Sequence, residues 1–218
     1  RNHVGKDELG FSGNMDWAVR MVSLLGIPAA AGLGFLAEPI LSVIFQRGAF
    51  TAETARMASY SLMAYAFGLL SFMLVKVLAP GYYSRQDTKT PVKIGIWCMA
   101  ANMLFNLIFA IPYGYVGLAI ATSLSATLNA ALLYIGLSRQ KVYVVSRLTL
   151  GFVARVMFST CAMVAAILWM QQGVDFTDLA LRDKIVSLTL TILLAVAVFG
   201  GCLFSFGIRV RHFKSKAF

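Results

Sequence analysis

Long, uninterrupted apolar runs dominate this chain and alternate with short polar segments. A bilayer core about 30 Å thick requires roughly 20 residues of helix. Runs of about this length or longer span 19–45, 57–79, 92–112, 115–137, 149–170 and 185–207. Their apolar positions are continuous, which is not the alternating pattern of membrane strands. We predict an all-α polytopic membrane protein with six transmembrane helices.

Two of the runs have compositions that predict local structure. Glycines and prolines, the last of them in the pair Glu38-Pro39, interrupt the first run. We therefore predict a kink or a break within it. The run 115–137 is rich in glycine, alanine and serine. Such small residues let helix backbones approach closely in lipid, so we expect this helix to lie inside the bundle.

Composition and charge add an orientation. The chain is 59% hydrophobic and 13% charged, and its mean hydropathy is +0.77, which suits a membrane protein. One side of the membrane receives thirteen lysines and arginines: Arg1, Lys6, Arg20, Arg85, Lys89, Lys93, Arg139, Lys141, Arg147, Arg209, Arg211, Lys214 and Lys216. The other side receives four: Arg47, Arg56, Arg182 and Lys184.

The positive-inside rule turns this asymmetry into a topology. It places both termini and the 80–93 and 138–148 loops in the cytoplasm, and the 46–56 and 171–184 loops outside. The net charge of +10 is then explained by the membrane, with no nucleic acid as partner.

Residues suited to catalysis are scarce. Cys98, Cys161 and Cys202 each lie in an apolar run, where a thiol behaves as a small hydrophobic group. His3 and His212 lie in the terminal segments, without a carboxylate or cysteine at ligand spacing. We predict no catalytic residue, no enzyme activity and no metal site of the thiolate or histidine type.

Three segments carry a family resemblance. Residues 78–93 (LAPGYYSRQDTKTPVK), preceded by 45–51 (FQRGAFT), closely resemble the MurJ (MviN) family of lipid II flippases. The resemblance begins at 15–20 (MDWAVR) and extends through the last apolar run. Members have fourteen transmembrane helices, and these six look like helices nine to fourteen. The implied fold is that of the multidrug/oligosaccharidyl-lipid/polysaccharide exporter superfamily, with two six-helix lobes around a central cavity and two further helices.

This resemblance implies a division of the chain. We expect a cytoplasmic lead-in, four helices completing the second lobe, a cytoplasmic loop, two appended helices forming a lipid-tail groove, and a basic cytoplasmic tail. Their bounds are 1–18, 19–137, 138–148, 149–207 and 208–218. The lead-in is polar, without an initiator methionine, and is typical of a loop entering a helix. We interpret the chain as the second part of a longer protein.

The resemblance also implies a function. Family members move lipid II, the undecaprenyl-diphosphate-linked cell-wall precursor, to the periplasmic leaflet of the bacterial inner membrane by alternating access. Expected partners are lipid II, membrane lipids, the missing N-terminal portion and cell-wall synthesis proteins. One alternative is a related exporter of drugs or other polyprenyl-linked sugars, because fold alone does not specify substrate. Another is a membrane scaffold without transport activity.

Four positions resemble a sodium site of some family members. Asn102 and Asn106 share a helix face, as do Leu118 and Thr122. Their amides, hydroxyl and backbone carbonyl offer hard oxygen ligands, so sodium is the one cofactor we consider. The sodium-binding relative has a carboxylate where this chain has Asn106, and its site includes an aspartate from a helix outside this chain. The alternative is that these polar groups only tie helices together.

Five cations are candidates for binding the substrate diphosphate. Arg155 and Lys76 lie within apolar runs, where they bind substrate or extend to the interface. Arg85, Lys89 and Lys93 lie in the 80–93 loop, where they meet the diphosphate at the cytoplasmic entrance or bind anionic lipid.

Other polar positions have gating or structural interpretations. Glu38 gates the cavity or caps a broken helix, and Pro80-Gly81 is expected to end a helix. Asp16 and Arg20, one turn apart, are expected to form a solvated cytoplasmic ion pair.

Overall fold

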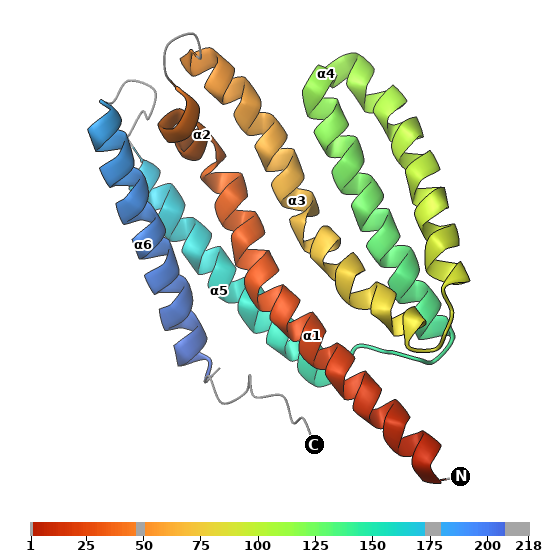
Figure 1. Cartoon of the computed structure of the whole chain (residues 1–218). Helices are drawn as coiled ribbons and strands as arrows, with labels where there is room; N and C mark the ends of the chain where they lie inside the picture. The colour runs from red at the N-terminus through yellow and green to blue at the C-terminus, as the bar shows by residue number, and fades with distance from the viewer. Residues whose placement is uncertain (1, 47–50, 173–179, 208–218) are drawn as a thin grey trace.

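The fold is a bundle of helices (Figure 1). The computed structural model describes residues 2–46, 51–172 and 180–207, with side chains from residue 11 onward except that of residue 52. Its helices are α1 (Asn2–Phe35), α2 (Ala37–Phe45), α3 (Ala52–Tyr83), α4 (Lys89–Arg139), α5 (Arg147–Gln171) and α6 (Leu181–Ser205). All but the short α2 are long and apolar enough to cross a membrane. The predicted all-α polytopic membrane class is confirmed.

Helix α4 contains two of the predicted crossings. Its backbone leaves the helical region at Gly114, where φ is 55° and ψ is −131°, a conformation that glycine adopts without steric cost. The two limbs then run antiparallel (Figure 1). Ser125 of the second limb donates a hydrogen bond of 2.7 Å to the carbonyl of Cys98 in the first. The five long helices therefore provide six crossings.

The break predicted in the first run is confirmed. Helix α1 ends at Phe35, Leu36 is non-helical, and α2 begins at Ala37. Pro39 occupies the first turn of α2, where a missing N–H costs little, but it cannot donate to Phe35 and so cannot continue α1. Glu38 lies half-buried in the same turn.

Two expectations about helix ends are wrong. The lead-in is helical from Asn2 rather than a loop, because it contains no proline and extends a helix that is already nucleated. Helix α3 also continues through Pro80-Gly81 to Tyr83. Pro80 still accepts a hydrogen bond of 3.0 Å from the Ser84 amide, so its missing donor does not stop the last turn.

The helices form a row in which each packs on its neighbours. Helix α1 lies between α3 and α5, α6 packs on α5 and α2, and the second limb of α4 packs on α3 (Figure 1). Large apolar side chains cover much of the outer surface, among them Ile111 and Leu148. Such a surface suits contact with lipid.

Hydroxyl groups line the contact between α3 and the second limb of α4. Ser123 donates to the carbonyl of Ala64 at 2.6 Å, and the hydroxyls of Ser71 and Thr127 lie 3.0 Å apart. The Ser123 side chain leaves no room for a Cβ at Gly68. The second limb carries a series of buried small residues, so the expected interior position of this helix is confirmed.

The ends of the helices lie at two opposite ends of the bundle (Figure 1). The start of α1, the 84–88 and 140–146 connectors and the end of α6 lie at the lower end in Figure 1. The turn at Gly114 and helix α2 lie at the upper end. This is the grouping that the charge asymmetry predicts.

Candidate functional site: an apolar groove and its two ends

An apolar groove lies between α1, α5 and α6. It has a volume of about 650 Å³. Its lining side chains are all apolar and include Leu24, Pro28 and Gly32 of α1, Met163 and Ile167 of α5, and Ala195, Phe199 and Leu203 of α6. Helices α5 and α6 thus provide two walls and α1 a third. Because its side chains offer no hydrogen bonds, the groove suits a hydrocarbon chain rather than a polar ligand.

Polar side chains join α1 to α5 at the lower end of this groove. The Tyr143 hydroxyl donates a hydrogen bond of 2.8 Å to Asp16, and the Ser146 amide donates to the same oxygen at 3.4 Å. Arg20 donates from Nε to the hydroxyl of Thr149 at 2.7 Å. Both Tyr143 and Thr149 are buried.

This arrangement corrects the expectation of a solvated ion pair. Asp16 binds the segment leading into α5 and Arg20 binds the first turn of α5, both more than 120 residues along the chain. Burial, the hydrogen bond to Asp16 and its negative charge together raise the pKa of the Tyr143 phenol. The phenol is therefore held neutral, as a hydrogen-bond donor.

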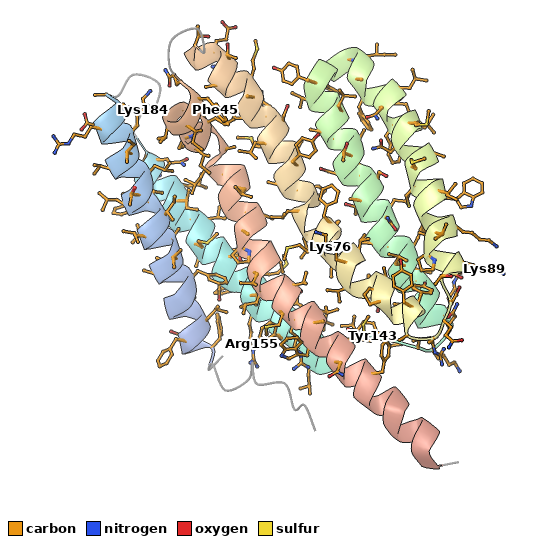
Figure 2. The ribbon with its side chains drawn as sticks, viewed as in Figure 1. Phe45, Lys76, Lys89, Tyr143, Arg155 and Lys184 are labelled. Carbon is orange, nitrogen blue, oxygen red and sulfur yellow. The ribbon has the colours of Figure 1, made fainter. Side chains whose placement is uncertain are left out.

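A second polar contact closes the upper end. Lys184 of α6 is only 5% exposed, and its Nζ donates a hydrogen bond of 2.7 Å to Oε1 of Gln46, directly after α2. Figure 2 shows Lys184 at the upper end of α6, close to α2. Gln171 at the end of α5 donates to the carbonyl of Phe35 at 3.2 Å. Sequence reasoning treated Lys184 only as a loop charge. Its place before the apolar run 185–207 was the available signal.

The proposed sodium ligands are bonded in pairs along each limb of α4. Asn106 donates from Nδ2 to Oδ1 of Asn102 at 3.1 Å, and Thr122 donates to the carbonyl of Leu118 at 2.8 Å. The Oδ1 atom of Asn106 is buried and has no hydrogen-bond partner. A buried oxygen without a donor fits a site for a cation.

The hairpin register brings the two pairs to matching levels. The bond between Ser125 and Cys98 places these residues opposite each other in antiparallel limbs. Moving from this pair one helical turn toward Gly114 on both limbs brings Asn102 about level with Thr122. A further turn along, the second asparagine lies level with Leu118. Among the residues described, no group of three or more His, Cys, Asp or Glu could hold a metal, so any cation here would depend on neutral oxygen ligands.

The candidate substrate-binding cations fall into three places. Arg85 is exposed in the connector between α3 and α4, whereas Lys89 and Lys93 are exposed in the first two turns of α4 and not in a loop as expected. Lys76 is exposed partway along α3, and Arg155 is exposed near the lower ends of α5 and α6 (Figure 2). The structure thus brings together the three cations around the α3–α4 connection. It places Lys76 and Arg155 apart from them and on different helices.

The connector that contains Arg85 and leads into α4 at Lys89 is ordered by Asp87. Its carboxylate accepts a hydrogen bond of 3.0 Å from the Thr90 amide at the start of α4. Hydrogen bonds from Thr90 lower the pKa of Asp87. Close by, Gly81 is buried against Leu137 while Pro80 is exposed.

These features define a multi-pass helical membrane protein with an apolar groove. The family model described as "Lipid II flippase MurJ" matches residues 1–181. The chain belongs to this family.

Named relatives agree with this assignment. A "Probable lipid II flippase MurJ" of Vibrio cholerae is 51% identical over 99% of this chain and 41% of its own length. One of Haemophilus influenzae is 47% identical over 99% of this chain and 44% of its own length. The present chain therefore spans less than half the length of these relatives.

A solved structure supports the fold. "Lipid II flippase MurJ, inward closed conformation" superposes with a TM-score of 0.74 and 23% identity. The match covers 94% of this chain and 42% of the other.

Proposed function

We propose that this chain is the C-terminal part of a lipid II flippase in the bacterial inner membrane, with both ends in the cytoplasm. The observation that carries the proposal is the family match over residues 1–181. The chain supplies four helices of the second lobe and the appended pair α5–α6. Its role is transport by alternating access rather than catalysis, with the rest of the protein supplying the first lobe and the opening helices of the second.

The groove has the chemistry to hold the prenyl tail during transport. Lipid and groove are similarly apolar, so moving the tail between them gains little hydrophobic free energy. The groove therefore serves to position the tail, and affinity comes from contacts to the polar head. Such positioning keeps the diphosphate near the cavity while the tail stays in an apolar environment.

Exposed cations at the lower end supply the contacts for the head. Arg85, Lys89 and Lys93 offer charge-assisted hydrogen bonds to a diphosphate entering from the cytoplasm. Arg155 lies near the lower end of the α5–α6 pair (Figure 2) and is placed to pair with a headgroup whose tail enters the groove. Growth supported by Arg155→Ala at normal protein abundance would remove Arg155 from this role.

Sodium binding at the α4 hairpin is a further part of the proposal. The buried Oδ1 of Asn106 and the matching levels of the two pairs support it. Asn102, Thr122 and the carbonyl of Leu118 would complete the part of the site that this chain supplies. Bound there, sodium would link the two limbs of the hairpin.

The decisive experiment is depletion and rescue. Cells lacking their lipid II flippase would express either the full-length protein or this segment alone, and periplasmic exposure of lipid II would be measured. We expect rescue by the full-length protein and none by the segment. Failure of a well-expressed full-length protein would favour an exporter of other polyprenyl-linked sugars, which the same apolar groove would serve.

A further inference from the structure

Lys184 is a buried charged residue that has no part in the transport function proposed above. It lies in the first turn of α6, which begins at Leu181, and its Nζ donates a hydrogen bond of 2.7 Å to Gln46, directly after the end of α2. One turn further along the same helix, Leu188 belongs to a buried apolar cluster with Leu36 and Ile167. A lysine is rarely this buried unless it is held by specific partners.

The hydrogen bond between Lys184 and Gln46 is placed where it can set the position of α6 relative to α2. Lipid tails are as apolar as the side chains that face them, so the hydrophobic effect does not press α5–α6 against α1–α2. Packing and polar bonds must set their relative positions. Polar contacts occur at both ends of the groove: Asp16 with Tyr143 at the lower end and Lys184 with Gln46 at the upper end.

We infer that Lys184 is a positioning residue that fixes the outer end of α6 to α2. Helices α1, α2, α5 and α6 then move as one body, and the groove keeps its width while the transporter changes conformation. Gln171 joins α5 to Phe35 at the same end, so without the Lys184 bond it is α6 that would move away from α2. This inference concerns the movement of helices and does not depend on which lipid is transported.

Spin-label distances in the full-length protein test it. Labels at Leu190 of α6 and Ile44 of α2 occupy exposed positions on the two helices that the bond joins. We expect a single narrow distance distribution in the wild type that does not change when sodium or lipid II is added. We expect Lys184→Gln to broaden this distance distribution. The glutamine side chain is shorter than lysine and carries no charge, so it cannot form the same hydrogen bond to Gln46.

Two further variants make the test specific. Exchanging the partners, as Lys184→Gln with Gln46→Lys, restores a lysine–amide bond and should restore the narrow distribution. Arg182→Gln removes an exposed charge two residues away and should leave the distribution unchanged.

Three results would overturn the inference. The first is a wild-type distribution with two distances. The second is a Lys184→Gln distribution as narrow as that of the wild type. The third is a broad distribution in the exchanged pair. If Lys184→Gln does not fold, the exchanged pair alone decides. Because no readout here is transport, a failed rescue experiment would leave these distances interpretable.

Discussion

The hydroxyl of Tyr143 lies 2.8 Å from the carboxylate of Asp16, although 127 residues separate them in sequence. This bond attaches the connector after α4 to the start of the membrane-crossing part of α1. It also sets the entry into α5, because the Ser146 amide shares the same carboxylate oxygen. The connector is therefore part of the packed structure and not a loose link.

Removing this hydroxyl should destabilise the protein. A hydrogen bond to a charged group contributes roughly 1.5–3 kcal/mol. For Tyr143→Phe we expect a loss at the low end of that range, because Asp16 is only half-buried. Thermal unfolding in detergent would measure it. Tyr83→Phe, at an exposed tyrosine, is the matched control and should have no effect.

The same phenol predicts a dependence on alkaline pH. The folded state holds the pKa of Tyr143 above its ordinary value, whereas an unfolded tyrosine loses its proton near pH 10. The resulting stability is fully present below about pH 10 and falls as pH rises above it. The stability difference between wild type and Tyr143→Phe should therefore narrow above pH 10. A constant difference up to pH 11 would contradict this.

Two glycines should respond in opposite ways to alanine. A Cβ at Gly68 would lie 2.6–2.9 Å from atoms of Ser123, whereas one at Gly95 meets nothing within 4 Å. We expect Gly68→Ala to separate α3 from α4 and cost about 1–3 kcal/mol. Gly95→Ala should stabilise its helix by about 0.5–1 kcal/mol. Denaturation of both variants side by side would reveal the difference in sign.

Sodium binding should depend on the α4 hairpin. Radiotracer sodium binding to the full-length protein should be lost in the variant Asn106→Ala with Thr122→Ala. It should strengthen in Asn106→Asp, because a carboxylate adds charge to a set of neutral oxygens. Asn129→Ala, at a half-buried asparagine of the same helix, is the control. Unchanged binding in the double variant would refute the site.

Filling the groove should impair transport. Ala29 lines it, and Ala29→Trp would occupy the space proposed for the tail. We expect transport to fall on the order of tenfold, because overpacking costs about 1–3 kcal/mol and every 1.4 kcal/mol is about tenfold in an equilibrium constant. Leu193→Trp, at an exposed position of α6 outside the lining, is the control. Equal activities of the two variants would show that the groove does not hold the tail.

The apolar runs predicted the membrane class and the six crossings because a helix in lipid must satisfy its own backbone, which leaves a long continuous signal. The break before α2 was also predictable, since Pro39 lacks the donor that α1 would need to continue. The interior position of the helix around Ser123 was predictable too, because the run 115–137 is rich in small residues that allow close helix packing.

The contacts at the ends of the groove were not predictable. Lys184 and Gln46 are 138 residues apart, and neither position shows a periodic pattern. Their pairing depends on where α2 and α6 meet, which is a property of the packed bundle. The helical lead-in was missed for a different reason: its polar composition is typical of a loop, and only its continuity with α1 makes it helical.

The reversal at Gly114 has a consequence for biosynthesis and for the accessibility of the turn. The chain turns back at a single non-helical residue, so almost nothing protrudes there for a protease or an antibody to reach. The two limbs also leave the ribosome in immediate succession and share the bond between Ser125 and Cys98. They can therefore enter the bilayer together as one preassembled hairpin, before α5 has been synthesised.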